Sequence, residues 1–138
     1  AYVQILLARS IPCFHMMEKS SVESNDIIYQ TVSYIARHFR EEMSLDRMAR
    51  DLGVSRFTLS RVFSGTFHRN FNQFLNEQRL NYAAIHLECS DESITDICMN
   101  AGFESQRTFN RVFRERYRMT PREYRILYKE KYLREEQT

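Results

Sequence analysis

The sequence of 138 residues predicts an all-α protein. It contains only three glycines and two prolines, which leaves little of the turn chemistry that β-hairpins need. Apolar residues recur at helical spacing along most of the chain, and a hydrophobic content of 43% is enough for one or two compact helical units. One pattern of residues also occurs twice, about 50 positions apart, which indicates that the chain repeats a structural unit.

Residues 1–24 are predicted to lie outside the repeated units. The stretch from Ile11 to Ser24 has no sustained periodicity and is typical of a linker. Before it, Val3 to Leu7 has the character of an apolar helix end that packs against another surface. Two interpretations of this remnant stay open: a short helix folded back on this domain, or the end of an upstream effector-binding or dimerisation domain. We expect the second.

The first unit is predicted over residues 25–70 and contains three helices. Asn25 or Asp26 caps a helix that ends around Arg40, with an inward stripe of Ile27, Ile28, Val32, Ile35, Ala36 and Phe39. Ser44 caps the next helix, which has the stripe Leu45, Met48, Ala49 and Leu52 and ends at Gly53. Ser55 caps the third, which turns Leu59, Val62 and Phe63 inward and Phe57, Ser60, Arg61 and Ser64 outward.

A long helix over residues 71–88 leads to the second unit, predicted over residues 89–130, and a charged tail follows at 131–138. The predicted buried residues of the long helix include Phe74, Leu75, Ala83 and Leu87. In the second unit the helical stripe is Ile94, Ile97, Cys98 and Ala101. Gly102 closes that helix and Ser105 begins another. The last helix of this pair turns Phe109, Val112 and Phe113 inward, which leaves Arg107, Asn110, Arg111 and Arg114 outward.

The two units are copies of one helix-turn-helix. An offset of 49 places Leu45, Met48, Ala49 and Gly53 on Ile94, Ile97, Cys98 and Gly102. An offset of 50 places Ser55, Thr58, Arg61, Val62 and Phe63 on identical residues at 105, 108, 111, 112 and 113. The long helix between them is about 25 Å long. Two recognition helices joined by a helix of this length can enter successive major-groove segments on one face of DNA, which recur about every 34 Å. Because the two outward faces differ, the site should be asymmetric.

The distribution of charge favours double-stranded DNA as the partner. A net charge of +2 is only mildly basic, but residues 55–128 carry eleven Lys/Arg against eight Asp/Glu, whereas residues 1–54 carry six against seven. Seventeen of the twenty cations are arginine, whose two-pronged fork reads guanine edges and holds phosphates, although the same excess is equally compatible with surface ion pairs. The alternative from another class is a helical protein-interaction module without sequence-specific DNA binding. Such a module would not need uncompensated arginine on both outward faces.

Other functional classes lack their characteristic residues. Cys13, Cys89 and Cys98 are odd in number and not closely paired, and the four histidines are too scattered for a ligand set, so we expect no disulfide framework, metal or cofactor. No nucleophile with a base, carboxylate pair or phosphate-cradling glycine loop is present, which argues against an enzyme. No apolar run approaches the length of a membrane span. We expect a cytoplasmic, nucleoid-associated protein without a membrane partner.

The motifs together resemble the signature of the AraC/XylS family of bacterial transcription regulators. They are Arg79-Leu80-x-x-Ala83, Ile94-x-x-Ile97-x-x-x-x-Gly102-Phe103-x-Ser105, Phe109-x-Arg111-x-Phe113 and Thr120-Pro121-x-x-Tyr124-Arg125. The resemblance covers about residues 26–128, and the second half is most similar to the MarA, SoxS and Rob subgroup. It implies about seven helices and control of transcription, most often activation through contact with RNA polymerase. Many members carry an N-terminal effector-binding domain, so it also implies a small-molecule effector that acts through an upstream domain.

The resemblance carries functional roles to matching positions. Base-edge contacts are expected from Arg56, Phe57, Ser60, Arg61, Gln106, Arg107, Asn110 and Arg111. Phosphate contacts are expected from Ser55, Thr58, Ser105, Thr108, Arg114 and Arg122. Among the departures, the glycine that usually follows each recognition helix is His68 or Arg118, and Phe57 replaces the tryptophan of the subgroup.

Some of these side chains have a structural alternative. Phe57 either touches a thymine methyl or packs against the preceding helix, and Arg61 and Arg111 either face DNA or pair with neighbouring acids. We expect Arg79 to form an ion pair within the scaffold, and Arg125 to contact the DNA backbone or the scaffold.

Overall fold

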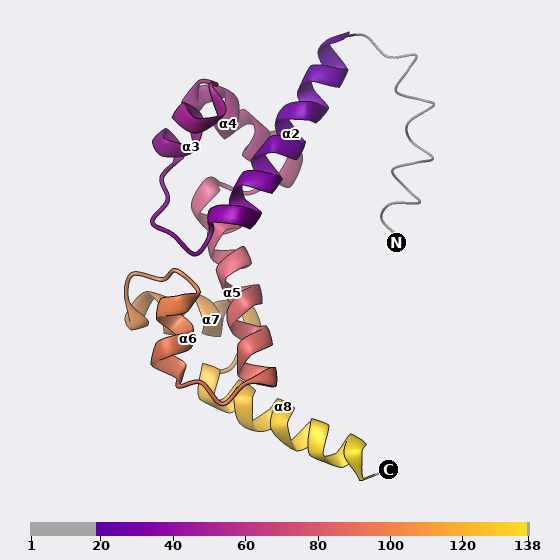
Figure 1. Cartoon of the computed structure of the whole chain (residues 1–138), viewed down its shortest axis with the longest axis vertical. Helices are drawn as coiled ribbons and strands as arrows, with labels where there is room; N and C mark the ends of the chain where they lie inside the picture. Colours follow the sequence, from indigo (N-terminus) through magenta and orange to yellow (C-terminus); the bar gives the residue numbers. More distant parts are fainter. Residues whose placement is uncertain (1–18, 138) are drawn as a thin grey trace.

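The structure of the chain is a computed structural model that describes residues 19–137 (Figure 1). These residues form seven α-helices, labelled α2 to α8, and no strand. The prediction of an all-α fold with about seven helices is therefore confirmed. The predicted N-terminal helical remnant and the linker up to residue 18 lie outside the described residues.

Two helix-turn-helix units are stacked along the long axis of the molecule, with α5 running between them (Figure 1). The first unit contains α2 (Lys19–His38), α3 (Leu45–Leu52) and α4 (Arg56–Val62), and α4 continues into the π-helical turn η1 (Phe63–Phe67). The connecting helix is α5 (Phe71–Cys89), and the second unit contains α6 (Ile94–Asn100), α7 (Gln106–Tyr117) and α8 (Pro121–Glu136). The helix-turn-helix pairs are α3 with α4 and α6 with α7, as predicted.

The first and last helices are longer than the sequence predicted. α2 begins at Lys19, so residues 19–24 are helical and not part of an irregular linker. They include neither glycine nor proline, so no residue there breaks the helix. At the other end α8 continues to Glu136, which makes most of the predicted charged tail helical.

The inward face of α2 is rotated from the predicted stripe. The buried residues are Thr31, Tyr34 and Ile35, whereas Val32 and Ala36 are exposed, contrary to prediction. Thr31 is buried because its hydroxyl donates to the carbonyl of Ile27 at 2.7 Å. The hydroxyl of Tyr34 donates to Oδ2 of Asp51 in α3 at 2.6 Å. Satisfied hydrogen bonds remove the cost of burying these polar atoms, and a search for apolar residues alone misses them.

The predicted cap of the first helix at Asn25 or Asp26 is wrong, because α2 begins at Lys19 and both residues lie inside it. The predicted serine caps of the later helices are confirmed. The hydroxyls of Ser44, Ser55 and Ser105 each accept a hydrogen bond from the backbone N–H three residues later. Asn70 and Thr120 form complete capping boxes with Gln73 and Glu123, respectively. These local interactions explain why α4, α5, α7 and α8 begin where they do.

The first helix of each helix-turn-helix ends at a glycine, whereas the recognition helices end at residues other than glycine. Gly53 and Gly102 have φ of 69° and 102° and end α3 and the α6 turn, as predicted. After the recognition helices, His68 and Arg118 take the same left-handed region with φ of 55° and 63°. The two recognition helices therefore end in the left-handed conformation that glycine usually adopts, although His68 and Arg118 both carry a Cβ atom.

Two hydrophobic cores share α5. The first core contains Tyr34, Ile35, Met48, Ala49, Leu59, Phe63, Phe71, Phe74 and Leu75. The second contains Leu80, Ala83, Ala84, Leu87, Ile97, Cys98, Ala101, Phe103, Phe109, Val112, Phe113 and Tyr124. The N-terminal half of α5 thus belongs to one core and its C-terminal half to the other. This confirms the predicted burial of Phe74, Leu75, Ala83 and Leu87.

Arg79 lies on α5 between the two cores and is only 8% exposed. Its Nε donates to the carbonyl of Phe39 at 2.7 Å and its Nη2 to the carbonyl of Glu41 at 2.9 Å. The prediction of a scaffold role is correct, but the predicted ion pair is wrong, because the partners are main-chain carbonyls. Burial lowers the pKa of Arg79, yet arginine starts so far above neutrality that the group stays charged.

Replacing His68 by glycine should stabilise the protein by about 1 kcal/mol. The left-handed region costs a residue with a Cβ about 1–2 kcal/mol, and the extra flexibility of glycine in the unfolded chain offsets only part of this gain. Urea unfolding followed by circular dichroism measures the difference. His68→Ala is the control, because it keeps the backbone cost and removes only the imidazole. Equal stability of the Gly and Ala variants would contradict the prediction.

Candidate nucleic-acid interface

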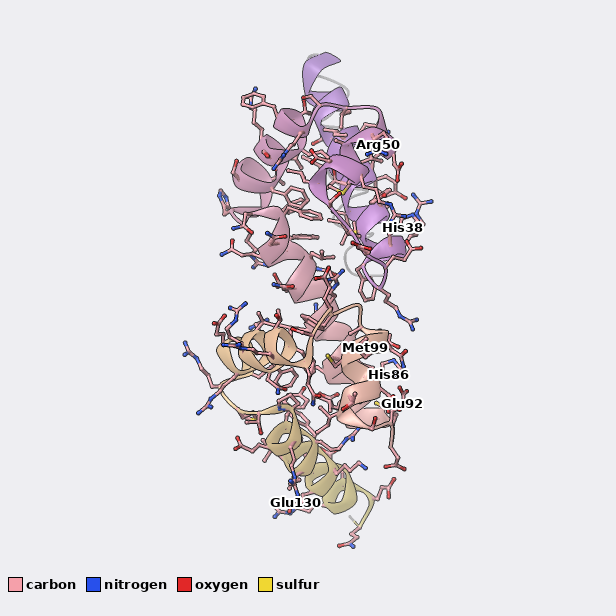
Figure 2. The ribbon with its side chains drawn as sticks, turned by 90° about the vertical axis from the view of Figure 1, so that its left-hand side faces the viewer. His38, Arg50, His86, Glu92, Met99 and Glu130 are labelled. Carbon is pink, nitrogen blue, oxygen red and sulfur yellow. The ribbon has the colours of Figure 1, made fainter. Side chains whose placement is uncertain are left out.

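The recognition helices α4 and α7 lie on the same side of the molecule, which is the left-hand side in Figure 2. The labelled residues His38, His86 and Met99 lie along the opposite side. Each recognition helix is held by apolar residues of one face. These are Leu59 and Val62 in α4, followed by Phe63, and Phe109, Val112 and Phe113 in α7.

Because the apolar face of α4 and of α7 is buried, the opposite face of each helix is exposed to solvent. All eight predicted base-contacting residues are exposed: Arg56, Phe57, Ser60, Arg61, Gln106, Arg107, Asn110 and Arg111. They form two groups, one on each recognition helix, and the structure brings both groups to one side of the chain. Their contacts with DNA stay a prediction.

The two recognition helices begin with the same arrangement of hydroxyls. In the first, Ser55 Oγ accepts from the N–H of Thr58 at 3.0 Å and lies 2.8 Å from the Thr58 hydroxyl. In the second, Ser105 Oγ accepts from the N–H of Thr108 at 3.2 Å and donates to the Thr108 hydroxyl at 3.0 Å. The four predicted phosphate-contacting hydroxyls therefore sit at helix N-termini, where the free N–H groups and the helix dipole favour an anion.

Two of the predicted base-contacting arginines form weak ion pairs with acidic residues nearby. Arg56 Nη1 lies 3.4 Å from Oδ1 of Asp46, and Arg111 Nη1 lies 3.4 Å from Oε1 of Glu115. All four side chains are more than 60% exposed, so each pair contributes about 1 kcal/mol or less. Arg111 thus makes the contact with a neighbouring acid that was the structural alternative, and its contact with DNA stays a prediction. A ligand with higher charge density displaces such partners readily.

Phe57 and Arg61 form a pair on the outward face of α4. The guanidinium carbon of Arg61 lies 5.8 Å from the centroid of the Phe57 ring. Phe57 itself is 71% exposed, so the alternative in which it packs against the preceding helix is wrong. An exposed aromatic ring beside an arginine provides an apolar contact and a bidentate donor in one place.

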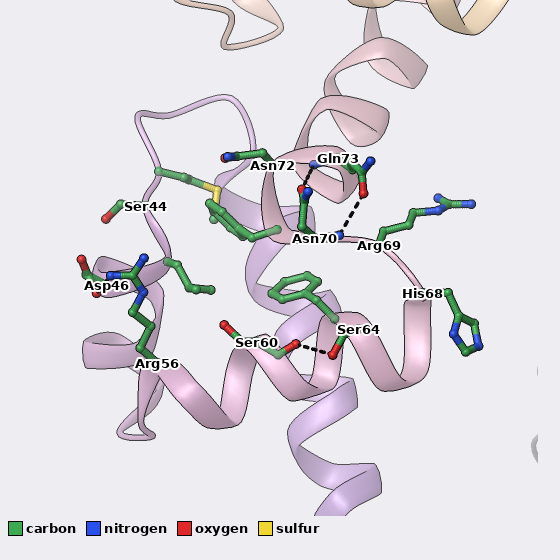
Figure 3. A pocket seen from close by; sticks show the side chains of 14 residues that line it. Ser44, Asp46, Arg56, Ser60, Ser64, His68, Arg69, Asn70, Asn72 and Gln73 are labelled. Carbon is green, nitrogen blue, oxygen red and sulfur yellow. Dashed lines mark hydrogen bonds and ion pairs between the residues drawn. The ribbon is translucent and has the colours of Figure 1, made fainter.

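A groove follows the recognition helix of the first unit, between α4, η1 and the N-terminus of α5 (Figure 3). The polar side chains that line it include Arg56, Ser60, Ser64, His68, Asn70 and Asn72. In Figure 3 Arg56 lies beside Asp46 on one side of the groove, and Asn70 and Gln73 form the capping box on the other. The groove therefore combines one edge of the reading face with a helix N-terminus.

The second unit contains the same groove with a different charge. Gln106, Asn110, Arg114, Arg118, Thr120 and Arg122 line it at positions 50 residues after those of the first groove. Ser64, His68 and Asn72 of the first groove thus correspond to three arginines. The sequence selected Arg114 and Arg122 and placed Ser64 on the outward face, but neither Ser64 nor Arg118 was predicted as a site residue. Extending the offset of 50 beyond Phe63 and Phe113 would have found them.

Two more predicted residues are accounted for by the scaffold. Arg125 is turned to α5, where Nε donates to the carbonyl of Leu87 at 3.4 Å and Nη2 to that of Ser90 at 3.3 Å. Cys98 is fully buried, as its inward position predicted, and burial raises the pKa of its thiol. Within residues 19–137, none of the helices has the length and apolar character needed to cross a membrane.

The comparisons with known proteins agree with this geometry. Residues 48–126 match a family model described as a helix-turn-helix domain. The chain is 34% identical over 99 residues to the regulatory protein SoxS of Escherichia coli (strain K12), a match that covers 72% of this chain and 92% of SoxS. It is 36% identical over 105 residues to an uncharacterized HTH-type transcriptional regulator of Staphylococcus aureus, covering 76% of this chain. The match spans only 14% of the length of that longer relative.

Solved structures with the same fold include two DNA-binding regulators. A transcriptional regulator from Chromobacterium violaceum, with an AraC-type DNA-binding domain, is 31% identical with a TM-score of 0.70, covering 76% of this chain and 94% of that one. The DNA-binding domain of AdpA, a global transcriptional factor, was solved in complex with a target DNA. It is 27% identical with a TM-score of 0.71, covering 75% of this chain and 94% of that domain.

Proposed function

The chain belongs to the AraC/XylS family of helix-turn-helix transcriptional regulators, and from this premise we propose that it is an activator that binds an asymmetric promoter site as a single chain. Double-stranded DNA is the partner of this family's DNA-binding domain. The relatives are named as regulators, and the family is not enzymatic. Both statements agree with the function predicted from the sequence.

The observation that carries the proposal is the presence of two exposed, equivalent reading faces on one side of one chain. α5 has 19 residues and is about 28 Å long, a length of the order of one turn of DNA, which supports a spacing of the two recognition helices that suits successive major-groove segments. One chain can then occupy two successive major-groove segments, as a dimer of single helix-turn-helix units does. Because Arg56, Phe57 and Ser60 correspond to Gln106, Arg107 and Asn110, the two half-sites differ in sequence.

Each group of residues has a proposed role. Arg61 and Arg111 read base edges, the ring of Phe57 meets a thymine methyl, and the amides Gln106 and Asn110 suit adenine. The helix N-termini at Ser55 and Ser105 hold backbone phosphates, together with Thr58, Thr108, Arg114 and Arg122.

The remaining partners are proposed from family membership. RNA polymerase is the partner through which an activator of this kind acts, in the cytoplasm on nucleoid DNA. A small-molecule effector would act through a domain upstream of α2. The Staphylococcus aureus relatives, of which this chain spans 14%, are long enough to hold such a domain.

Binding-site selection with the purified chain should yield an asymmetric sequence of about two helical turns. Sedimentation equilibrium of the complex should give one protein chain per DNA. Two chains on a palindromic site would contradict the single-chain mode. If selection enriches no sequence at all, the helical protein-interaction module becomes the better interpretation.

Arg61→Ala and Arg111→Ala should each weaken specific binding by about 1–3 kcal/mol, since each removes a bidentate base contact. The two variants should lose preference at different base pairs, about one helical turn apart. Base-preference profiles from titration of a mutated-site library measure this. Arg50→Ala is the control, because Arg50 is exposed on α3 and lies away from α4 and α7 in Figure 2. A uniform loss across all sequences for Arg111→Ala would assign the second unit to the backbone alone.

The difference in charge between the two grooves predicts opposite effects of a matched pair of substitutions. Arg114→Ser should lower the slope of log K against log salt by about one, because it removes one phosphate-neutralising cation. Ser64→Arg, at the equivalent position of the first groove, should raise the slope by about one. Binding to non-specific DNA at several salt concentrations provides both values. Unchanged slopes for both variants would place the grooves away from the phosphates.

A further inference from the structure

The segment that follows α2 lies in a tight junction between the two units. In Figure 1 the end of α2 reaches α5 just above the turn between α6 and α7. Arg79 of α5 holds the carbonyls of Phe39 and Glu41, as described above. From the other side, Nε of Arg40 donates to the carbonyl of Asn100 at 2.6 Å. The first unit is thus attached to the second by hydrogen bonds in addition to the apolar packing of the two cores.

Gly102 allows this close approach. A Cβ atom at position 102 would lie 2.7 Å from the carbonyl oxygen of Phe39 and 2.9 Å from Cα of Arg40. Gly53 ends the equivalent helix of the first unit, and a Cβ atom there would have nothing within 4 Å. Both glycines have positive φ, but only Gly102 also makes room for the backbone of the other unit.

Aromatic rings complete the junction. The guanidinium of Arg40 lies 4.8 Å from the centroid of Tyr82, and the ring of Phe39 lies 5.9 Å from the same ring. The guanidinium of Arg79 lies 5.9 Å from the centroid of Phe103. Phe39 packs against the first core, Tyr82 packs against the second and Phe103 belongs to the second. Rotating one unit relative to the other would break hydrogen bonds and ring contacts together.

We propose that this junction, made by Phe39, Arg40, Arg79, Tyr82, Gly102 and Phe103, sets the spacing between the two DNA half-sites that the chain accepts. The inference rests on the proposed function, because it takes α4 and α7 to read one DNA molecule. Adding one base pair between the half-sites moves the second by about 3.4 Å and turns it by about 34°. The hydrogen bonds of 2.6–2.9 Å that Arg40 and Arg79 make, and the close approach of the backbone of residues 39–40 to Gly102, oppose such a turn. The junction residues touch no base, so their role is positioning.

The test varies the spacer in a DNA that contains both half-sites of the selected sequence. Dissociation constants are measured for spacers shortened or lengthened by one and two base pairs, and for each half-site alone. The native chain should prefer one spacing by about tenfold or more over its neighbours. Gly102→Ala should reduce this preference to about threefold or less, or move it to another spacing, while its affinity for each isolated half-site stays within about twofold.

Gly53→Ala is the matched control, since it places a Cβ in the same left-handed region without a clash, and it should keep the native spacing preference. Arg40→Ala is the second junction variant. Arg40 is exposed, so its loss removes the contacts with Asn100 and Tyr82 without opening a core. Arg40→Ala should also reduce the preference for one spacing. If thermal unfolding shows that Gly102→Ala does not fold, the Arg40→Ala result tests the positioning role.

The outcomes separate the two hypotheses. Native-like spacing profiles for every folded junction variant would overturn the positioning role and leave the proposed function intact. So would a native chain that binds its site specifically but tolerates all spacers. A native chain that binds no sequence specifically would overturn both. A changed profile in a junction variant, with a native profile for Gly53→Ala, supports the proposal.

Discussion

The relative placement of the two units depends on the buried guanidinium of Arg79 and the carbonyls it holds. Those carbonyls belong to Phe39 and Glu41, just after the end of α2, where the last main-chain acceptors lack partners within the helix. The negative end of the helix dipole also favours a cation there. With α2 and α5 packed as they are, loss of these hydrogen bonds would leave a buried charge and two carbonyls without partners, which typically costs several kcal/mol. The interaction therefore restrains the end of α2 against α5.

This constraint matters because neither unit has a core of its own that excludes α5. Phe71, Phe74 and Leu75 complete one core, and Leu80, Ala83 and Leu87 are part of the other. A helix that belongs to both cores couples their stability, and a helix held at its centre by Arg79 bends less easily. If the junction acts as proposed, the two recognition helices move as one body, which is the condition for reading two adjacent segments of a duplex in register.

The repeat separates what the scaffold needs from what the surface can vary. The serine caps, the buried aromatic residues and the left-handed helix ends recur in both units. Between these anchors the exposed positions differ freely, so Ser64, His68 and Asn72 correspond to Arg114, Arg118 and Arg122. One backbone arrangement thus presents a mostly polar groove in the first unit and a strongly cationic one in the second. This divergence on a shared scaffold supports the asymmetric site proposed above.

The sequence by itself determined the serine caps, most of the helices and the outward faces of the recognition helices, because these depend on residues within about four positions of each other. The repeat was visible as a residue pattern that recurs about 50 positions later. The sequence was also sufficient to select Arg61 and Arg111, whose exposure follows from the buried Phe63 and Phe113 beside them. Only the tertiary structure decided which side of α2 is buried, since Tyr34 is satisfied by an aspartate 17 residues away. Likewise, the carbonyl partners of Arg79 lie about 40 residues from it along the chain. The grooves beside α4 and α7 also arise only when a following helix N-terminus packs nearby, and no local pattern encodes contacts at that sequence separation.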